Sequence, residues 1–150
     1  MNKEKTDYGT LNRLNLHLVV GLYRSISRIS RSTQKLMAQY NLTEPQFGVL
    51  EVLYHLGSMK IGDIIAKTLS TSGNMTVVIR NLEQEGWVTR CTDPADKRVC
   101  LIQITKEGKN LIDTIFPEHL KDLAGMLNHL QQEEKEQLLH LLKKMNHLKK

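Results

Sequence analysis

The stretch from residue 70 to residue 81 contains no acidic side chain, and its residue types are those that contact DNA. Folded as a helix over residues 71–85, it would bury Met75, Ile79 and Leu82 on one narrow stripe. The opposite side would present groups that hydrogen-bond base edges or phosphates, or that touch a thymine methyl. The candidate DNA contacts on this helix are Ser72, Gly73, Asn74, Thr76, Val77 and Arg80. The alternative is an ordinary solvated helix face, although such faces usually mix Glu with Lys.

After Gly86 the apolar period changes from 3.6 residues to 2, which predicts a β-hairpin. Its strands are expected over residues 87–91 and 98–104, with a loop centred on residues 93–97. Arg90 on the first strand is a further candidate phosphate contact. The loop contains Asp96, Lys97 and Arg98, which are candidate DNA contacts. The alternative is that Asp96 and Arg98 form only an exposed ion pair, which contributes about 0–1 kcal/mol to stability.

The hairpin also carries both cysteines, Cys91 and Cys100, which are candidates for sensing an oxidant. If the turn centres between Ala95 and Asp96, the two cysteines face each other directly, with Cβ atoms roughly 4.5–5.5 Å apart. That separation is slightly beyond relaxed disulfide geometry, so oxidation would distort the hairpin. The alternative is that each cysteine is a small, half-buried hydrophobic residue.

Helical segments precede the hairpin. A long amphipathic helix is expected over residues 11–39, and Thr43 and Gln46 can form a capping box for a second helix that ends near Leu56. A short third helix fits residues 61–67, before the helix over residues 71–85. Two short helices followed by a hairpin is the order of a winged helix-turn-helix, whose second helix enters the DNA major groove.

Two more helices follow the hairpin, one capped by Thr105 and kinked or interrupted at Pro117, and one starting near Glu133. The last helix carries more apolar surface than one small domain needs, so a shared helical interface in a homodimer is expected. The alternative is that these leucines fill the core of a monomer. The leucines concerned are Leu120, Leu123, Leu127, Leu138, Leu142 and Leu148.

Length and composition limit the possible functions. The 150 residues and 17.2 kDa fit one domain, and a net charge of +5 with a pI near 9.2 fits an anionic partner. No window approaches the ~18–20 apolar residues of a membrane span, and we expect a reducing, cytoplasmic location.

The sequence lacks the phosphate-loop, nucleophile-elbow and paired-cysteine motifs of common enzymes, so no enzymatic activity, cofactor or metal site is predicted. The six histidines are better explained as solvated.

The sequence resembles the MarR family of transcriptional regulators over about residues 11–148. The resemblance rests on LTEPQFGVLEVLYHLG, on the segment from IGDIIAKT to the hairpin, on the acid-x-Arg pattern Asp96-Lys97-Arg98, and on Thr105-Lys106-Glu107-Gly108. It implies a mainly α fold with a β-hairpin wing, in one MarR-like domain over residues 1–150. Residues 44–105 would form the winged helix-turn-helix lobe, and residues 11–40 and 106–148 the dimerisation helices.

The resemblance also implies a function. A homodimer would bind a pseudo-palindromic operator in double-stranded DNA, with half-sites about 34–36 Å apart. The helix over residues 71–85 would lie in the major groove, and Arg98, oriented by Asp96, would reach into the minor groove from the wing over residues 87–104, where negative potential attracts arginine. Such regulators are typically repressors released by a small ligand or an oxidant. By family analogy, Tyr23 and Phe47 could line a pocket for an aromatic ligand. The rival hypothesis is a MarR-like protein-interaction module without specific DNA binding.

Overall fold

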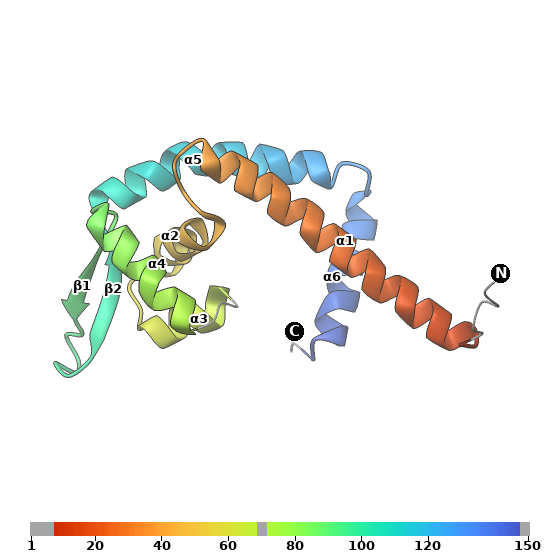
Figure 1. Cartoon of the computed structure of the whole chain (residues 1–150), viewed down its shortest axis with the longest axis horizontal. Coiled ribbons are helices and arrows are strands. Elements are labelled where there is room, and N and C mark those ends of the chain that lie inside the picture. The colour runs from red at the N-terminus through yellow and green to blue at the C-terminus, as the bar shows by residue number, and fades with distance from the viewer. Residues whose placement is uncertain (1–7, 69–71, 148–150) are drawn as a thin grey trace, which may run out of the picture.

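The computed structural model describes residues 8–68 and 72–147, which form six helices and a two-stranded antiparallel hairpin (Figure 1). The elements are α1 (Thr10–Ala38), α2 (Glu44–Leu56), α3 (Ile61–Thr68), α4 (Ser72–Gln84), β1 (Val88–Thr92), β2 (Cys100–Ile104), α5 (Lys106–Met126) and α6 (Gln132–Met145). The predicted fold class, mainly helical with a β-hairpin wing, is confirmed. Thr71 and Leu148, which the sequence analysis placed in helices, lie outside the described residues.

Local sequence signals set the ends of α2. The Thr43 hydroxyl accepts a hydrogen bond from the Gln46 N–H at 3.3 Å, and the Gln46 side chain accepts one from the Thr43 N–H at 2.8 Å. This is the predicted capping box, which satisfies two backbone donors at the helix start. At the other end Gly57 has a φ of 82°, a conformation that a residue with a side chain rarely adopts.

The hairpin is shorter than the sequence predicts. β2 begins at Cys100, two residues after the expected start, because residues 93–99 form a hydrogen-bonded turn. In that turn the Asp93 N–H donates to the Val99 carbonyl at 2.9 Å, and the Val99 N–H donates to the Asp96 carbonyl at 2.9 Å. The turn therefore takes up the residues that the alternating pattern assigned to the second strand.

The register of the hairpin corrects the prediction that the two cysteines face each other. Cys91 pairs with Leu101, and Cys100 pairs with Thr92. Because successive side chains of a strand point to opposite faces, Cys91 and Cys100 lie on opposite faces of the hairpin. Both thiols are free, and a disulfide between them would require the strands to shift register.

The core lies between α2, α3, α4 and the hairpin, and it extends to the last turns of α1 and the first half of α5. A single bridge joins the α2–α3 connection to the wing: the Met59 N–H donates to the Ile102 carbonyl at 3.1 Å, and the Ile102 N–H donates to the Met59 carbonyl at 2.9 Å. Ile102 is fully buried. The wing is thus attached both to the helix-turn-helix and to the core.

Much of α1 and most of α6 are exposed within the described chain. In Figure 1 the first half of α1 extends away from the other helices, and α6 has no buried residue. Large apolar side chains are exposed there, among them Leu14, Leu18, Val19, Ile26, Leu138 and Leu141. α5 runs through Pro117 without interruption, contrary to one of the two expectations for that residue.

The first turn of α5 is pressed against the backbone of Trp87. Thr105 caps this turn by accepting a hydrogen bond from the Gly108 N–H at 3.1 Å, and its own hydroxyl donates to the Gly86 carbonyl at 2.7 Å. A Cβ atom on Gly108 would lie 2.3 Å from the Trp87 carbonyl oxygen and 2.8 Å from the side chain of Ile104. Glycine is therefore required here by the close approach of the helix to the hairpin.

We expect Gly108→Ala to destabilise the protein by about 1–3 kcal/mol, because the added methyl must push α5 away from the hairpin. Gly62→Ala in α3 is the control, since a Cβ there meets nothing within 4 Å. Urea unfolding followed by circular dichroism measures both free energies of unfolding. Equal stability of the two variants would contradict the packing argument.

Candidate nucleic-acid interface

α4 buries one narrow stripe and exposes the predicted DNA contacts. Met75, Ile79 and Leu82 are completely buried. The opposite side exposes Asn74, Thr76, Val77 and Arg80, as the helical period predicted. Ser72 begins the helix, but the side chains of Ser72 and Gly73 lie outside the described part of the structure. The exposed groups can donate and accept hydrogen bonds, and Val77, which is 43% exposed, supplies an apolar contact.

Asp96 holds Arg98 outward at the tip of the wing. The Arg98 guanidinium donates from Nε to Asp96 Oδ1 at 3.1 Å and from its Nη2 to Oδ2 at 3.2 Å, while the Arg98 backbone N–H donates to Oδ1 at 3.0 Å. The Arg98 side chain nevertheless remains 91% exposed, and Lys97 beside it is exposed as well. This arrangement leaves guanidinium surface free to contact a phosphate or a base edge.

The hydrogen bonds from Arg98 lower the pKa of Asp96 below its usual value of 3.8. Lys60 adds a smaller Coulombic contribution in the same direction, which places this lysine near the wing. Sequence reasoning did not select Lys60, because only the long-range pairing of Met59 with Ile102 brings the start of α3 to the hairpin. Both effects keep Asp96 ionised and therefore able to orient Arg98 at neutral pH.

Arg90 is engaged by a residue that the sequence analysis did not select. Its Nε and Nη2 donate to the two carboxylate oxygens of Glu83 in α4, at 2.9 and 3.1 Å. This contact raises the pKa of Arg90 above its usual value and joins α4 to the wing. The predicted phosphate contact from Arg90 stays a prediction, and much of its charge is compensated by Glu83.

A cavity of about 420 Å³ opens between α1, α2, α3 and α5. Phe47 and His119 line it, with their ring centroids 5.0 Å apart, and Lys67 of α3 lies at its edge. His119 is buried, and its Nδ1 atom has no hydrogen-bond partner in the structure. Of the two predicted ligand-pocket residues, Phe47 lines this cavity, whereas Tyr23 is 69% exposed and lines neither of the two main cavities.

His119 is the residue of this cavity that the sequence analysis missed. The sequence analysis interprets all six histidines as solvated, since nothing in the local pattern of His119 distinguishes it from the others. Within residues 8–68 and 72–147, no group of three or more His, Cys, Asp or Glu side chains is placed to hold a metal ion. The same residues contain no helix that is long and apolar enough to cross a membrane.

Comparison with known proteins identifies the family. The MarR family profile matches residues 42–100. The transcriptional regulator MhqR of Bacillus subtilis is 35% identical over 131 residues, which cover 87% of this chain and 90% of MhqR. The chain belongs to the MarR family.

Two further relatives extend over most of this MarR protein. The uncharacterised regulator YkoM of Bacillus subtilis is 33% identical over 139 residues, covering 90% of each chain. A solved structure of Bordetella bronchiseptica BpsR superimposes with a TM-score of 0.77 at 25% identity, covering 87% of this chain and 98% of BpsR. That structure concerns the regulation of BpsR DNA binding by 6-hydroxynicotinic acid. The resemblance to MarR proteins is confirmed, and this chain is a DNA-binding transcriptional regulator of the MarR type, a non-enzymatic family.

We expect the pKa of Asp96 to rise in Arg98→Ala relative to the wild-type protein, because the side-chain hydrogen bonds from Arg98 are the largest cause of its lowered pKa, while the backbone N–H of residue 98 and Lys60 remain in the variant. The pKa is lowered on folding, so the wing contact stabilises the protein above pH 3.8 and is lost as the pH falls through the folded-state pKa. Carboxyl-detected NMR measures both titrations, with Arg24→Ala as a control that removes a distant arginine. An unchanged Asp96 pKa in Arg98→Ala would show that the contact does not form in solution.

Proposed function

We propose that this MarR protein is a sequence-specific repressor that binds double-stranded operator DNA as a homodimer. α4 would lie in the major groove and the wing in the minor groove, with residues 44–105 forming the DNA-binding lobe. The observation that carries the proposal is the pair of surfaces on one side of the lobe, the acid-free exposed face of α4 and the outward-held Arg98. A narrow minor groove concentrates negative potential and attracts such an arginine.

The unpartnered apolar side chains support the homodimer. Exposed leucines, valines and isoleucines line α1, and exposed leucines with Met145 line α6. A contiguous apolar surface of this kind is unfavourable in water and indicates a protein interface. The predicted interface leucines fit this role in part: Leu120, Leu127 and Leu138 are 51%, 40% and 43% exposed. Two copies of residues 11–40 and 106–148 would cover these faces and place two α4 helices on a pseudo-palindromic site.

The cavity beside Phe47 supports a small aromatic effector. An unpaired polar atom in a buried site is costly, and Nδ1 of His119 would gain a partner from a bound ligand. The Phe47 ring offers an apolar wall, and Lys67 offers a cation for a carboxylate. Glu44 and Glu51 also line the cavity; the Glu44 carboxylate already accepts hydrogen bonds from Ser30 at 2.6 Å and Gln34 at 3.0 Å, so the carboxylate of a ligand must lie on the Lys67 side, away from Glu51. Aromatic carboxylic acids, the class to which the ligand of BpsR belongs, fit this set of groups.

Two alternatives receive less support. An oxidant acting through a disulfide within one wing would need Cys91 and Cys100 on the same face, and the register places them on opposite faces. An interaction module without DNA specificity would tolerate acidic residues on the exposed face of α4. The described part of that face carries Asn74, Thr76, Val77 and Arg80 instead.

We expect Arg98→Ala to weaken binding to the operator at least about 30-fold, because each of the two protomers loses a groove contact worth roughly 1–3 kcal/mol, which is roughly 2–6 kcal/mol for the dimer. Fluorescence anisotropy against the DNA upstream of its own gene and a scrambled duplex, at about 50 and 200 mM salt, measures the affinity and its specificity.

Arg24→Ala on α1 is the matched control, with the same charge change at an exposed arginine far from α4 and the wing. Both variants should sediment as dimers. An operator affinity that is unchanged in Arg98→Ala would exclude the wing contact, and a monomeric wild-type protein would exclude the homodimer.

We expect 6-hydroxynicotinic acid to bind and to lower operator affinity, and His119→Phe to weaken this binding at least about tenfold. The phenylalanine keeps a ring against Phe47 but removes the nitrogen, whose hydrogen bond to a charged ligand is worth roughly 1.5–3 kcal/mol. Isothermal titration calorimetry measures the affinities. The matched control is His55→Phe, since the His55 ring contacts Tyr54 edge-to-face and Phe116 at a tilt and does not line the cavity. Equal ligand affinity in the two variants would remove His119 from the site.

A further inference from the structure

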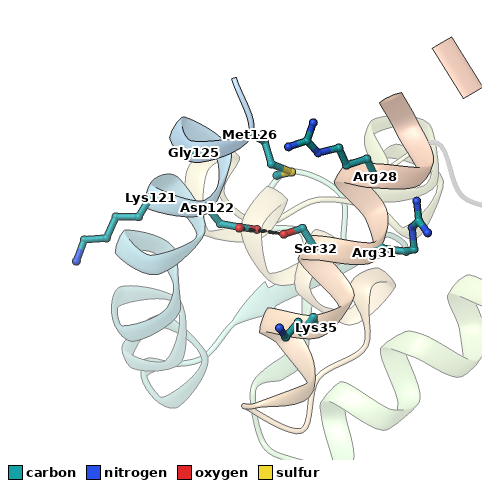
Figure 2. Close-up of a pocket in the computed structure, with 8 residues that line it drawn as sticks. All are labelled: Arg28, Arg31, Ser32, Lys35, Lys121, Asp122, Gly125 and Met126. Carbon is teal, nitrogen blue, oxygen red and sulfur yellow. Dashed lines mark hydrogen bonds between the residues drawn. The ribbon is translucent and has the colours of Figure 1, made fainter. Parts of the chain in front are cut away.

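A second cavity, of about 510 Å³, lies in the groove between α1 and α5. Figure 2 shows a hydrogen-bonded pair formed by Ser32 and Asp122 in this groove, with Arg28 and Lys35 of α1 on its two sides, while Arg31 of α1 and Lys121 of α5 project away from the pair. Gly125 and Met126 complete the lining and give the groove a patch of carbon surface. Four cations and one carboxylate leave the groove with a net charge of +3, which is most of the net charge of the whole chain.

In the part of the chain that the structure describes, the carboxylate of the groove forms no ion pair with these cations. Asp122 accepts hydrogen bonds from the Ser32 hydroxyl at 2.9 and 2.7 Å and so faces the seam between the helices. Within the described residues none of the four cations takes part in an ion pair, and Arg31 donates only to the Ser27 carbonyl of its own helix, at 3.1 Å. Like charges one helical turn apart, such as Arg31 and Lys35, destabilise a helix. An anion between them would relieve that repulsion.

The α1 side of the groove is separate from both surfaces used by the proposed function, whereas on α5 its residues Lys121 and Met126 are chain neighbours of the proposed interface residues Leu120 and Leu127. Arg28, Arg31 and Lys35 lie about 140–200° around the helix axis from Ile26, at 100° per residue, so a partner covering the apolar face of α1 leaves them open. In Figure 1 the wing extends away from α5, so DNA on the wing and α4 lies on the other side of the lobe.

The groove also lies back to back with the aromatic cavity. Ser32 and Asp122 line the cationic groove, whereas their chain neighbours Thr33 and Leu123 line the cavity beside Phe47. The two sites therefore share the seam where α1 packs on α5. A ligand in either one contacts both helices.

We propose that this groove binds a small organic polyanion that carries two or more carboxylate or phosphoryl groups, as a site distinct from the aromatic cavity. Two or more negative groups are needed to engage cations that come from both helices. The carbon surface of Met126 and the open position at Gly125 accept a short carbon skeleton. In Figure 2 Arg28 extends toward Met126 while Lys121 projects outward, and these long side chains can turn onto a ligand without moving the backbone.

The test is calorimetric titration of the full chain with citrate and, separately, with inorganic pyrophosphate, at a constant ionic strength of about 150 mM so that screening does not change. We expect saturable binding of at least one probe. Citrate alone would identify carboxylates as the ligand groups, and pyrophosphate alone would identify phosphoryl groups. Absence of saturable binding of both probes would overturn the proposal.

The double variant Arg28→Gln/Lys35→Gln should weaken that binding by up to about 25-fold and by more than its control, because each partly exposed charge contact contributes up to roughly a factor of five. The control is Lys135→Gln/Lys143→Gln on α6, with the same change in net charge at exposed positions outside the groove. Equal weakening in the two variants would mean that only net charge matters and would overturn the proposal.

Two further measurements separate this site from the proposed function. Citrate or pyrophosphate binding should persist in the presence of saturating 6-hydroxynicotinic acid, and competition between them would assign the anion to the aromatic cavity. Operator affinity of Arg28→Gln/Lys35→Gln should equal that of its control. A selective loss of operator affinity together with a loss of anion binding would show that the groove contacts DNA phosphates, which would overturn the proposal.

Discussion

The architecture depends on the burial of a single narrow stripe of α4. Met75, Ile79 and Leu82 are fully buried, and Ile102 of β2 and Ile64 of α3 complete the same core. Burying side chains of this size stabilises a protein by roughly 1.5–3 kcal/mol each, so the rotation of α4 about its axis is strongly fixed. The opposite face is then exposed by geometry alone. Because the wing shares this core, the recognition helix and the wing keep a fixed relation to each other.

Charge pairing then divides the arginines of the lobe into two kinds. Arg90 is held by Glu83 and ties the wing to α4, so its guanidinium is largely compensated. Arg98 is also paired, but with a residue of its own turn, and it stays almost fully exposed. An ion pair of this kind contributes little stability. The effect of the ion pair is to orient the Arg98 side chain. A side chain that is already held in one direction loses less conformational entropy when it binds DNA.

The seam between α1 and α5 is the place where the DNA-binding lobe meets the apolar helices. His119 and Thr33 are buried on one side of it, and the Ser32–Asp122 hydrogen bonds lie on the other. A change in the packing of α1 on α5 would alter the position of the lobe relative to a partner protomer, and hence the spacing of two recognition helices. A ligand on either side of the seam would therefore change DNA affinity, provided that it binds the two packing arrangements of α1 on α5 with unequal affinity.

The sequence by itself determined the elements and the exposed face of α4. The periods, the capping box at Thr43 and the Thr105-x-x-Gly108 turn are local, so residues close in the chain were enough to predict them. The turn of the wing was not predictable in this way, because hydrogen bonds within residues 93–99 outweigh the alternating pattern and shift the cysteines to opposite faces.

Only the tertiary structure decided which partners the titratable groups have. Glu83 beside Arg90, Lys60 near Asp96, and the buried His119 against Phe47 all depend on contacts between different elements. Side-chain type and helical period set which way a residue points on its own helix. What it meets there is set by the packing of helices that are far apart in the chain, and no local pattern records that packing.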